Sequence, residues 1–228
     1  DLVRSRGLGD VYKRQDMTYA AFDYADRDRN PVLILADGVI GTMMEPVVLP
    51  GMKSEEEVAA LKASKQGWAC VGHKLDYAHR AWIQPGHWLT SDMQKANEDA
   101  AALYESWKKD VQVEEYRLED AEVVLTAYGI SARICKSAVE LLRAQGVKAG
   151  LIRPITVHPF PYAAYDHIDY SKVKAVLDVE MSIPAQFVDD VAVAVKDRCL
   201  IETCLCSGGN IMSRDKVLAA VKKIMEGK

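Results

Sequence analysis

The chain has 228 residues and a formal net charge of -4, from 29 Lys and Arg against 33 Asp and Glu. That length is sufficient for one or two domains, each with a hydrophobic core. Hydrophobic residues make up 49% of the sequence and charged residues 27%, which excludes intrinsic disorder and collagen-like repeats. The acidic balance and the lack of clustered Lys and Arg argue against a nucleic-acid partner.

The apolar segments and the cysteines indicate the compartment. The longest apolar stretch, residues 31–52, is interrupted by Asp37 and Glu45, so no membrane span is predicted. The chain has five cysteines, an odd number at irregular spacing, which predicts reduced thiols in a cytoplasmic protein and no disulfide framework. These cysteines are Cys70, Cys135, Cys199, Cys204 and Cys206.

Residues 1–15 (DLVRSRGLGDVYKRQ) differ from the rest of the chain. They lack helical or strand periodicity and the apolar core of a signal peptide. The segment is similar to translated adapter sequence at the broken ends of gene models. We expect it to be non-native and outside the fold, the chain being a fragment that lacks its true N-terminus. The alternative is a natural basic arm.

Residues 16–52 are predicted to form a helix followed by a buried strand. Apolar side chains at helical spacing predict a helix over 17–27, and the continuous apolar run 31–36 predicts a buried strand. Residues 39–52 contain two prolines and two glycines, which predicts a loop. The side chains expected to form the apolar face of the helix are Tyr19, Phe22 and Ala25.

Residues 53–117 are predicted to be a linker or lid. Ser54 followed by three glutamates predicts a short capped helix with an acidic first turn. A long polar helix is predicted from Thr90 to about Lys109, and it keeps one face apolar. We expect this helix to strap the two halves of the chain together. Its apolar face consists of Met93, Ala96, Ala100, Leu103 and Trp107.

Residues 118–228 have the most regular pattern. Strands alternate with amphipathic helices, and this order requires parallel strands joined by right-handed crossovers. The fold class is therefore α/β with an open parallel sheet, whose binding sites lie at the carboxyl ends of the strands. Strands are predicted over 121–127, 147–152, 173–179 and 199–205, and helices over 131–145, 184–196 and 213–225.

Polar residues at the strand exits are the candidate site residues. Gly129 and Ser131 open a helix; they either offer amide hydrogens to a phosphate, such as that of coenzyme A, or form an ordinary turn with a serine cap. Arg153 either holds a carboxylate, including one from a partner subunit, or makes a plain salt bridge. Thr156 ends the same exit segment. Glu180 is either a catalytic acid or an inter-domain hydrogen-bond acceptor.

Asp37 is the candidate residue of the first half. It ends the first predicted strand, where it either makes the turn or faces the cofactor-binding half of a partner subunit.

The histidines and cysteines predict no metal site. His73, His79 and His87 lack the spacing of a helical metal pair. The cysteines near the C-terminus lack a Cys-x-x-Cys step and a fourth nearby cysteine, so we expect buried structural thiols at Cys204 and Cys206.

Several segments, in one order along residues 16–227, carry a family resemblance. They are Arg29–Gly38 (RNPVLILADG), Met43–Pro46 (MMEP), Glu119–Gly129 (EDAEVVLTAYG), Ala132–Ile134 (ARI), Gly150–Thr156 (GLIRPIT) and Pro159–Pro161 (PFP). Together they resemble the alpha subunit of 2-oxoacid:ferredoxin oxidoreductases, closest to the branched-chain 3-methyl-2-oxobutanoate (VorB-like) branch.

The resemblance implies a domain organisation. In this family a pyrimidine-binding domain for thiamine diphosphate precedes a transketolase C-terminal-like domain. Residues 16–52 would then be the end of the first domain, 53–117 the linker, and 118–228 the second domain. The catalytic residues of the family lie further upstream and have no counterpart in this chain, so we expect the isolated chain to show no turnover.

The resemblance also implies a reaction, the oxidative decarboxylation of a 2-oxoacid to an acyl-CoA with electrons passed to ferredoxin. The implied cofactor is thiamine diphosphate with Mg2+, which would do the carbanion chemistry and be shared with a beta subunit. Coenzyme A would be a substrate. The further implied partners are a gamma subunit, a ferredoxin-like delta subunit and ferredoxin, with iron-sulfur clusters in the partner subunits.

The sequence departs from the family in two places. Ala185 replaces a glycine in the loop after Glu180, and His158 replaces an aromatic residue before Pro-Phe-Pro. Both departures bear on the substrate more than on the fold. Two alternatives stay open: a beta-type E1 subunit of a lipoamide-linked 2-oxoacid dehydrogenase, and a non-catalytic α/β assembly module.

Overall fold

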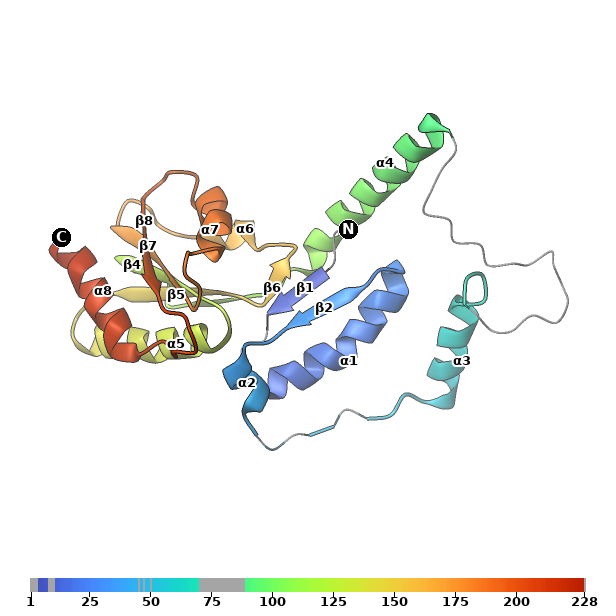
Figure 1. Cartoon of the computed structure of the whole chain (residues 1–228), viewed down its shortest axis with the longest axis horizontal. Coiled ribbons are helices and arrows are strands. Elements are labelled where there is room, and N and C mark those ends of the chain that lie inside the picture. The colour runs from blue at the N-terminus through green and yellow to red at the C-terminus, as the bar shows by residue number, and fades with distance from the viewer. Residues whose placement is uncertain are drawn as a thin grey trace, which may run out of the picture.

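The computed structural model describes residues 4–7, 11–44, 46, 48–49, 51–69 and 89–227. Their strands form two sheets, a three-stranded sheet in the order β2-β1-β6 and a five-stranded sheet in the order β3-β5-β4-β7-β8 (Figure 1). In the described ranges no helix has the length and apolar character that a membrane span requires.

The larger sheet confirms the predicted open α/β fold. Strands β5, β4, β7 and β8 run parallel, and β3 pairs with β5 in the antiparallel direction. The edge strand β3 is absent from the sequence prediction, because its four residues, Val-Glu-Glu-Tyr, have too few apolar positions to stand out. The strands are β3 (Val113–Tyr116), β4 (Val123–Thr126), β5 (Ala149–Pro154), β7 (Ala175–Glu180) and β8 (Leu200–Leu205).

Helices cover both faces of this sheet. Helices α5 (Gly129–Ala144) and α8 (Arg214–Glu226) pack on one face, with α6 (Tyr162–Tyr165) and α7 (Phe187–Val195) on the other (Figure 1). The central strands β4 and β7 are buried along their whole length, which explains their nearly continuous apolar sequence.

The smaller sheet joins the two halves of the chain. Strand β1 (Arg4–Gly7) pairs in parallel with β2 (Val32–Leu35) and in antiparallel with β6 (Thr156–His158). Helix α1 (Val11–Asp28) lies against β2. The expectation that residues 1–15 lie outside the fold is therefore wrong for 4–7 and 11–15. Strand pairing uses backbone groups, so a segment without apolar periodicity can still occupy a place between two strands.

The buried face of α1 differs from the predicted one. Met17 and Ala21 are buried, whereas Phe22 is 70% exposed and Tyr19 is 40% exposed. The aromatic residues therefore lie on the solvent side, and the smaller pair at i, i+4 spacing faces the interior. The predicted loop 39–52 begins with the short helix α2 (Gly38–Thr42).

The two helices of the linker pack little. Helix α3 (Glu55–Ser64) has the predicted cap, a capping box between Ser54 and Glu57. Helix α4 (Thr90–Ser106) has no buried residue and projects from the molecule (Figure 1), so its predicted role as a strap is wrong. Its alanine-rich apolar face is too small to bury much area. Only the short 3-10 helix η2 (Trp107–Asp110) that follows is anchored, by buried Trp107.

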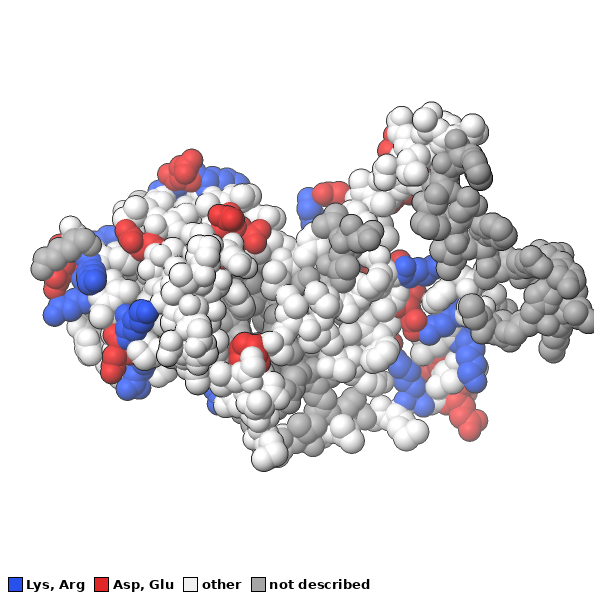
Figure 2. All heavy atoms as spheres, viewed as in Figure 1, with Lys and Arg blue, Asp and Glu red and all other residues white. Residues whose placement is uncertain are grey.

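Charged groups are interspersed over the surface. Figure 2 shows acidic and basic side chains mixed across the described part of the visible face, without one dominant basic patch. That distribution agrees with the composition and offers no stripe of positive charge for a phosphate backbone on this face.

Candidate functional site

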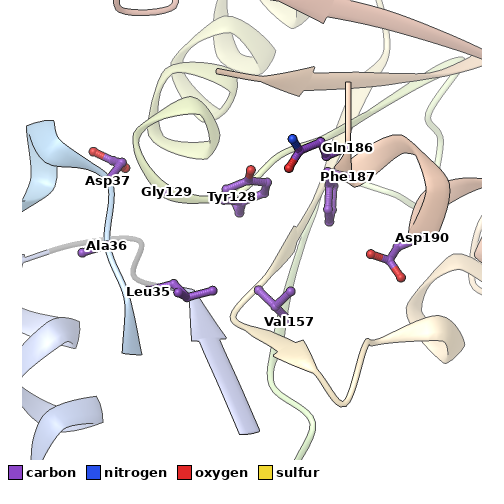
Figure 3. A pocket seen from close by; sticks show the side chains of 9 residues that line it. All are labelled: Leu35, Ala36, Asp37, Tyr128, Gly129, Val157, Gln186, Phe187 and Asp190. Atoms are coloured by element: carbon purple, nitrogen blue, oxygen red, sulfur yellow. The ribbon is translucent and has the colours of Figure 1, made fainter. Parts of the chain in front are cut away.

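A cavity of about 340 Å³ lies where the two sheets meet, at the carboxyl ends of β2 and β4 (Figure 3). The small sheet contributes Leu35 and Asp37, and the segment after β4 contributes Tyr128 and Gly129. The start of α7 completes the wall with Phe187 and Asp190. The position is the one at which open α/β sheets bind ligands.

Asp37 is placed in the cavity wall by the end of β2. Its Oδ1 accepts a hydrogen bond from the backbone N–H of Ile40 at 2.8 Å and caps helix α2. Its Oδ2 accepts from the backbone N–H of Ile130 at 2.8 Å, in the first turn of α5. Asp37 therefore makes the predicted turn and also links the two halves of the chain.

Helix α5 begins at Gly129, which has a φ of 57°. Glycine adopts this left-handed conformation at little cost. The residue at the N-cap position, Tyr128, makes no side-chain capping bond, and Ser131 lies buried inside the first turn. The prediction that Ser131 caps this helix is therefore wrong. Asp37 supplies the missing acceptor, so one amide that we considered for a phosphate is already bound to a carboxylate.

Glu180 ends the central strand β7 and is 1% exposed. Its Oε1 accepts from the backbone N–H groups of Gln186 at 2.8 Å and Phe187 at 3.1 Å. Glu180 therefore caps helix α7, whose N-cap residue has no side-chain bond of its own. Both contacts lie within residues 118–228, so the structure records no inter-domain hydrogen bond from Glu180 to a described residue.

Asp178 is a buried carboxyl group that sequence reasoning missed; it does not line the cavity wall, but its charge would act on Tyr128, which does. It lies two positions before Glu180 on the same face of β7 and is 0% exposed. Neither of its carboxyl oxygens has a well-formed hydrogen bond to a described residue, although the carboxyl of Glu180 lies close enough to share its proton. Burial, with a smaller contribution from neighbouring Glu180, raises the pKa of Asp178 to about 8. A signal was present in the sequence, because aspartate in an apolar strand is rare unless it is functional or paired.

Arg153 and Thr156 lie outside the cavity wall. The Nη1 of Arg153 donates to the Oε2 of Glu114 at 2.8 Å across β5 and β3, so the structure has the salt-bridge alternative. Thr156 is buried, and its Oγ1 accepts from the backbone N–H of Gln112 at 3.0 Å. The Arg153 ion pair therefore lies within the larger sheet, and the Thr156 hydrogen bond ties β6 of the small sheet to the segment that precedes β3.

The thiols of the second half are mostly buried. Cys135, Cys204 and Cys206 are buried and Cys199 is half-buried. Burial raises the pKa of the Cys204 thiol, which makes it a poor nucleophile or ligand. In the part of the chain that the structure describes, no group of three His, Cys, Asp or Glu side chains could hold a metal ion. Cys70, His73, His79 and His87 lie outside the described residues.

The cavity does not fit a diphosphate. Its described wall contains the carboxylates of Asp37 and Asp190 and no lysine or arginine. Phosphate groups are held by cationic side chains, metal ions or free amides, and carboxylates repel them. The described wall of this cavity therefore supplies neither a site for thiamine diphosphate nor one for the phosphates of coenzyme A.

Comparisons with known proteins agree with this fold. Residues 121–217 match the family model for pyruvate:ferredoxin oxidoreductase core domain II. The ketoisovalerate oxidoreductase subunit VorB of Methanothermobacter marburgensis is 36% identical over 94% of this chain and 58% of its own length. The resemblance to VorB-type subunits is confirmed. The chain spans 58% of the length of that VorB subunit.

More distant relatives extend the same pattern. The 2-oxoglutarate synthase subunit KorA of Methanocaldococcus jannaschii is 30% identical over 76% of this chain and 50% of its own length. The homologues of this chain are thus subunits of 2-oxoacid oxidoreductases that act on different acids. A solved 2-oxoglutarate:ferredoxin oxidoreductase from Magnetococcus marinus has the same fold, with a TM-score of 0.73 over 97% of this chain and 42% of its own, at 18% identity.

Proposed function

We propose that this chain is part of the alpha-type subunit of a cytoplasmic 2-oxoacid:ferredoxin oxidoreductase. The complete enzyme would decarboxylate a branched-chain 2-oxoacid oxidatively to an acyl-CoA and pass the electrons to ferredoxin. The 36% identity to a VorB subunit across 94% of the chain carries the proposal. The choice of a branched-chain acid rests on the same relative.

The acidic cavity fits a division of labour between subunits. Because no lysine or arginine is among the described residues of its wall, we assign thiamine diphosphate and Mg2+ to a beta subunit and to sequence outside this chain. Coenzyme A would be the acyl acceptor, and the iron-sulfur clusters would belong to gamma and delta partner subunits. Within this account the described residues position elements, and none of them performs the chemistry.

Asp37 and Glu180 are the positioning residues of the proposed subunit. Asp37 holds the start of α5 against the end of β2, and Glu180 holds the start of α7 against β7. Both helices begin at the wall of the cavity between the sheets. The carboxylates of Asp37 and Glu180 therefore fix the edge at which residues 16–52 meet the transketolase C-terminal-like part, residues 118–228.

The locus and the complex test the proposal together. A long sequencing read through codon 15 is expected to continue in frame into a pyrimidine-binding domain, beside genes for a thiamine-diphosphate subunit and a cysteine-rich ferredoxin-like subunit. The tagged full-length product is expected to copurify with both when the genes are co-expressed. Neighbouring genes for a lipoyl-bearing acyltransferase would favour the lipoamide-linked alternative, and purification of the chain alone would favour an assembly module.

A further inference from the structure

A second, larger cavity of about 740 Å³ lies beside the first. It is bounded by the end of α4, by the His158-Pro-Phe-Pro segment after β6, and by α7. The two cavities share Val157 and Asp190 as wall residues, so Asp190 stands between them. Nothing in the proposed reaction uses this second cavity.

Asp190 is the carboxylate of this cavity that has no lysine or arginine partner among the described residues; the basic group that acts on it is the imidazole of His158 in the same wall. The other two carboxylates in the wall are already neutralised, since Asp166 lies 2.7 Å from the Nη1 of Arg198 and Glu105 forms an ion pair with Lys108. The side chain of Asp190 is half-buried and makes no ion pair or hydrogen bond with any described residue; burial raises its pKa, and His158 opposes that rise. A carboxylate withdrawn from water without a partner is costly, and an incoming cation would remove that cost.

Aromatic rings line the rest of the cavity. Tyr104 packs at 4.9 Å from Trp107 on one side, and Phe160 packs at 4.9 Å from Tyr162 on the other. The Asp190 carboxylate lies close enough to Tyr162 to raise the pKa of its phenol, although burial is the larger cause. Aromatic faces attract ammonium and guanidinium groups and also pack against apolar stems.

We propose that this cavity binds a protonated amine or guanidinium carried on an apolar stem, with Asp190 as the counter-charge and the rings of Tyr104, Phe160 and Tyr162 around the stem. The described wall has three carboxylates against one ammonium and one imidazole, that of His158, which disfavours anions. Figure 3 shows the side chain of Asp190 extending from α7 toward Val157, the residue common to both cavities. A cation bound to Asp190 would therefore lie at the wall that separates the two cavities.

This ligand chemistry has two sources, a free small amine or a lysine or arginine side chain of another polypeptide segment. The probes separate them. The small probe is 2-phenylethylammonium, and its neutral control is 2-phenylethanol, which has almost the same shape. The peptide probe is acetyl-Gly-Leu-Lys-Leu-Gly-amide, and its control carries norleucine in place of lysine.

The experiment is an NMR titration of the 15N-labelled 228-residue chain. We expect the ammonium probe to shift the amide signals of Ala163 and Asp190 and to bind at least about tenfold more tightly than the alcohol, the size of one charge-assisted hydrogen bond. Asp190→Asn should abolish that preference. Asp189→Asn, which alters an exposed carboxylate one position away, should keep the preference at least as large, because the charge of Asp189 disfavours the ionised form of Asp190.

The outcomes separate the sources and can overturn the proposal. A lysine peptide that binds more tightly than the free amine, and does so through Asp190, identifies a basic side chain of another polypeptide. Binding of the amine without the peptide identifies a small ligand. Equal binding of amine and alcohol by the unaltered chain overturns the proposal, and that comparison does not depend on the folding of any variant. Tyr104→Leu should weaken the binding of the amine severalfold, while the preference for the ammonium over the alcohol remains.

Discussion

The carboxylate of Asp37 crosses from the small sheet to accept the backbone N–H of Ile130, 93 positions away, at 2.8 Å. Its other oxygen accepts from Ile40 in the helix that Asp37 itself precedes. One side chain therefore caps two helices: α2, which follows a strand of the small sheet, and α5, which follows a strand of the large sheet. Helix α5 has no side-chain cap of its own, so its first turn depends on the first half of the chain.

Asp37→Ala should lower the free energy of unfolding by about 1–2 kcal/mol, because each lost N-cap costs roughly 1 kcal/mol. Asp37→Asn should have an intermediate effect, since an amide has one acceptor oxygen and can serve one helix. Urea unfolding measures the energies, and hydrogen exchange at Ile40 and Ile130 locates them. Unchanged protection of the Ile130 amide in the alanine variant would show that the link between the halves carries no energy.

Asp178 predicts an unusual dependence of stability on pH. Its pKa rises from the ordinary carboxyl value to about 8 on folding, so the folded state retains a proton that the unfolded state loses. The contribution of the Asp178 proton to the free energy of unfolding is complete below about pH 4 and is lost as pH rises through about 8. In Asp178→Asn the fall in the urea midpoint with rising pH that Asp178 causes should disappear between pH 4 and 9. An identical slope in the variant would contradict the assignment.

Glu180→Gln tests the coupling of the two buried carboxyls. The variant removes the charge beside Asp178 and keeps an oxygen that can cap α7, so the pKa of Asp178 should fall toward its ordinary value while α7 persists. Glu180→Ala should also destabilise α7, by about 1–3 kcal/mol, because two buried N–H groups lose their acceptor. Carboxyl NMR titration of Asp178 gives the first result and thermal unfolding the second. An unchanged Asp178 titration in Glu180→Gln would show that burial acts alone.

Gly150 is required by close packing in strand β5. A Cβ added there would lie 2.8 Å from the backbone oxygen of Arg117 and 2.9 Å from a methyl carbon of Leu118. Gly150→Ala should therefore destabilise the chain by about 1–3 kcal/mol, the usual cost of overpacking. Gly41→Ala is the matched control, since a Cβ at Gly41 meets nothing within 4 Å. Equal stability of the two variants by urea unfolding would contradict this packing.

Most of the second half of the fold was predictable from sequence because the long strands and helices of 118–228 each have their own apolar pattern; β6 and α6, of three and four residues, are too short to show one and were not predicted. The sequence could not reveal the site to the same extent. Asp37 and Ile130 are distant in the chain, and their hydrogen bond follows from how two sheets meet, which no local pattern encodes. Asp178 was hidden because strand periodicity emphasises its apolar neighbours. Strand β1 was missed because its place depends on the backbone groups of β2 and β6.

The central claim is that this chain works as part of a multi-subunit 2-oxoacid oxidoreductase. The most direct test compares viologen reduction by the isolated 228-residue chain with reduction by the full-length subunit co-expressed with its partner subunits, using 3-methyl-2-oxobutanoate, 2-oxoglutarate and pyruvate. We expect no turnover from the isolated chain and coenzyme A-dependent reduction by the complex, fastest with the branched-chain acid. Turnover by the isolated chain, or an assembled and cofactor-loaded complex that oxidises none of the three acids, would contradict the account.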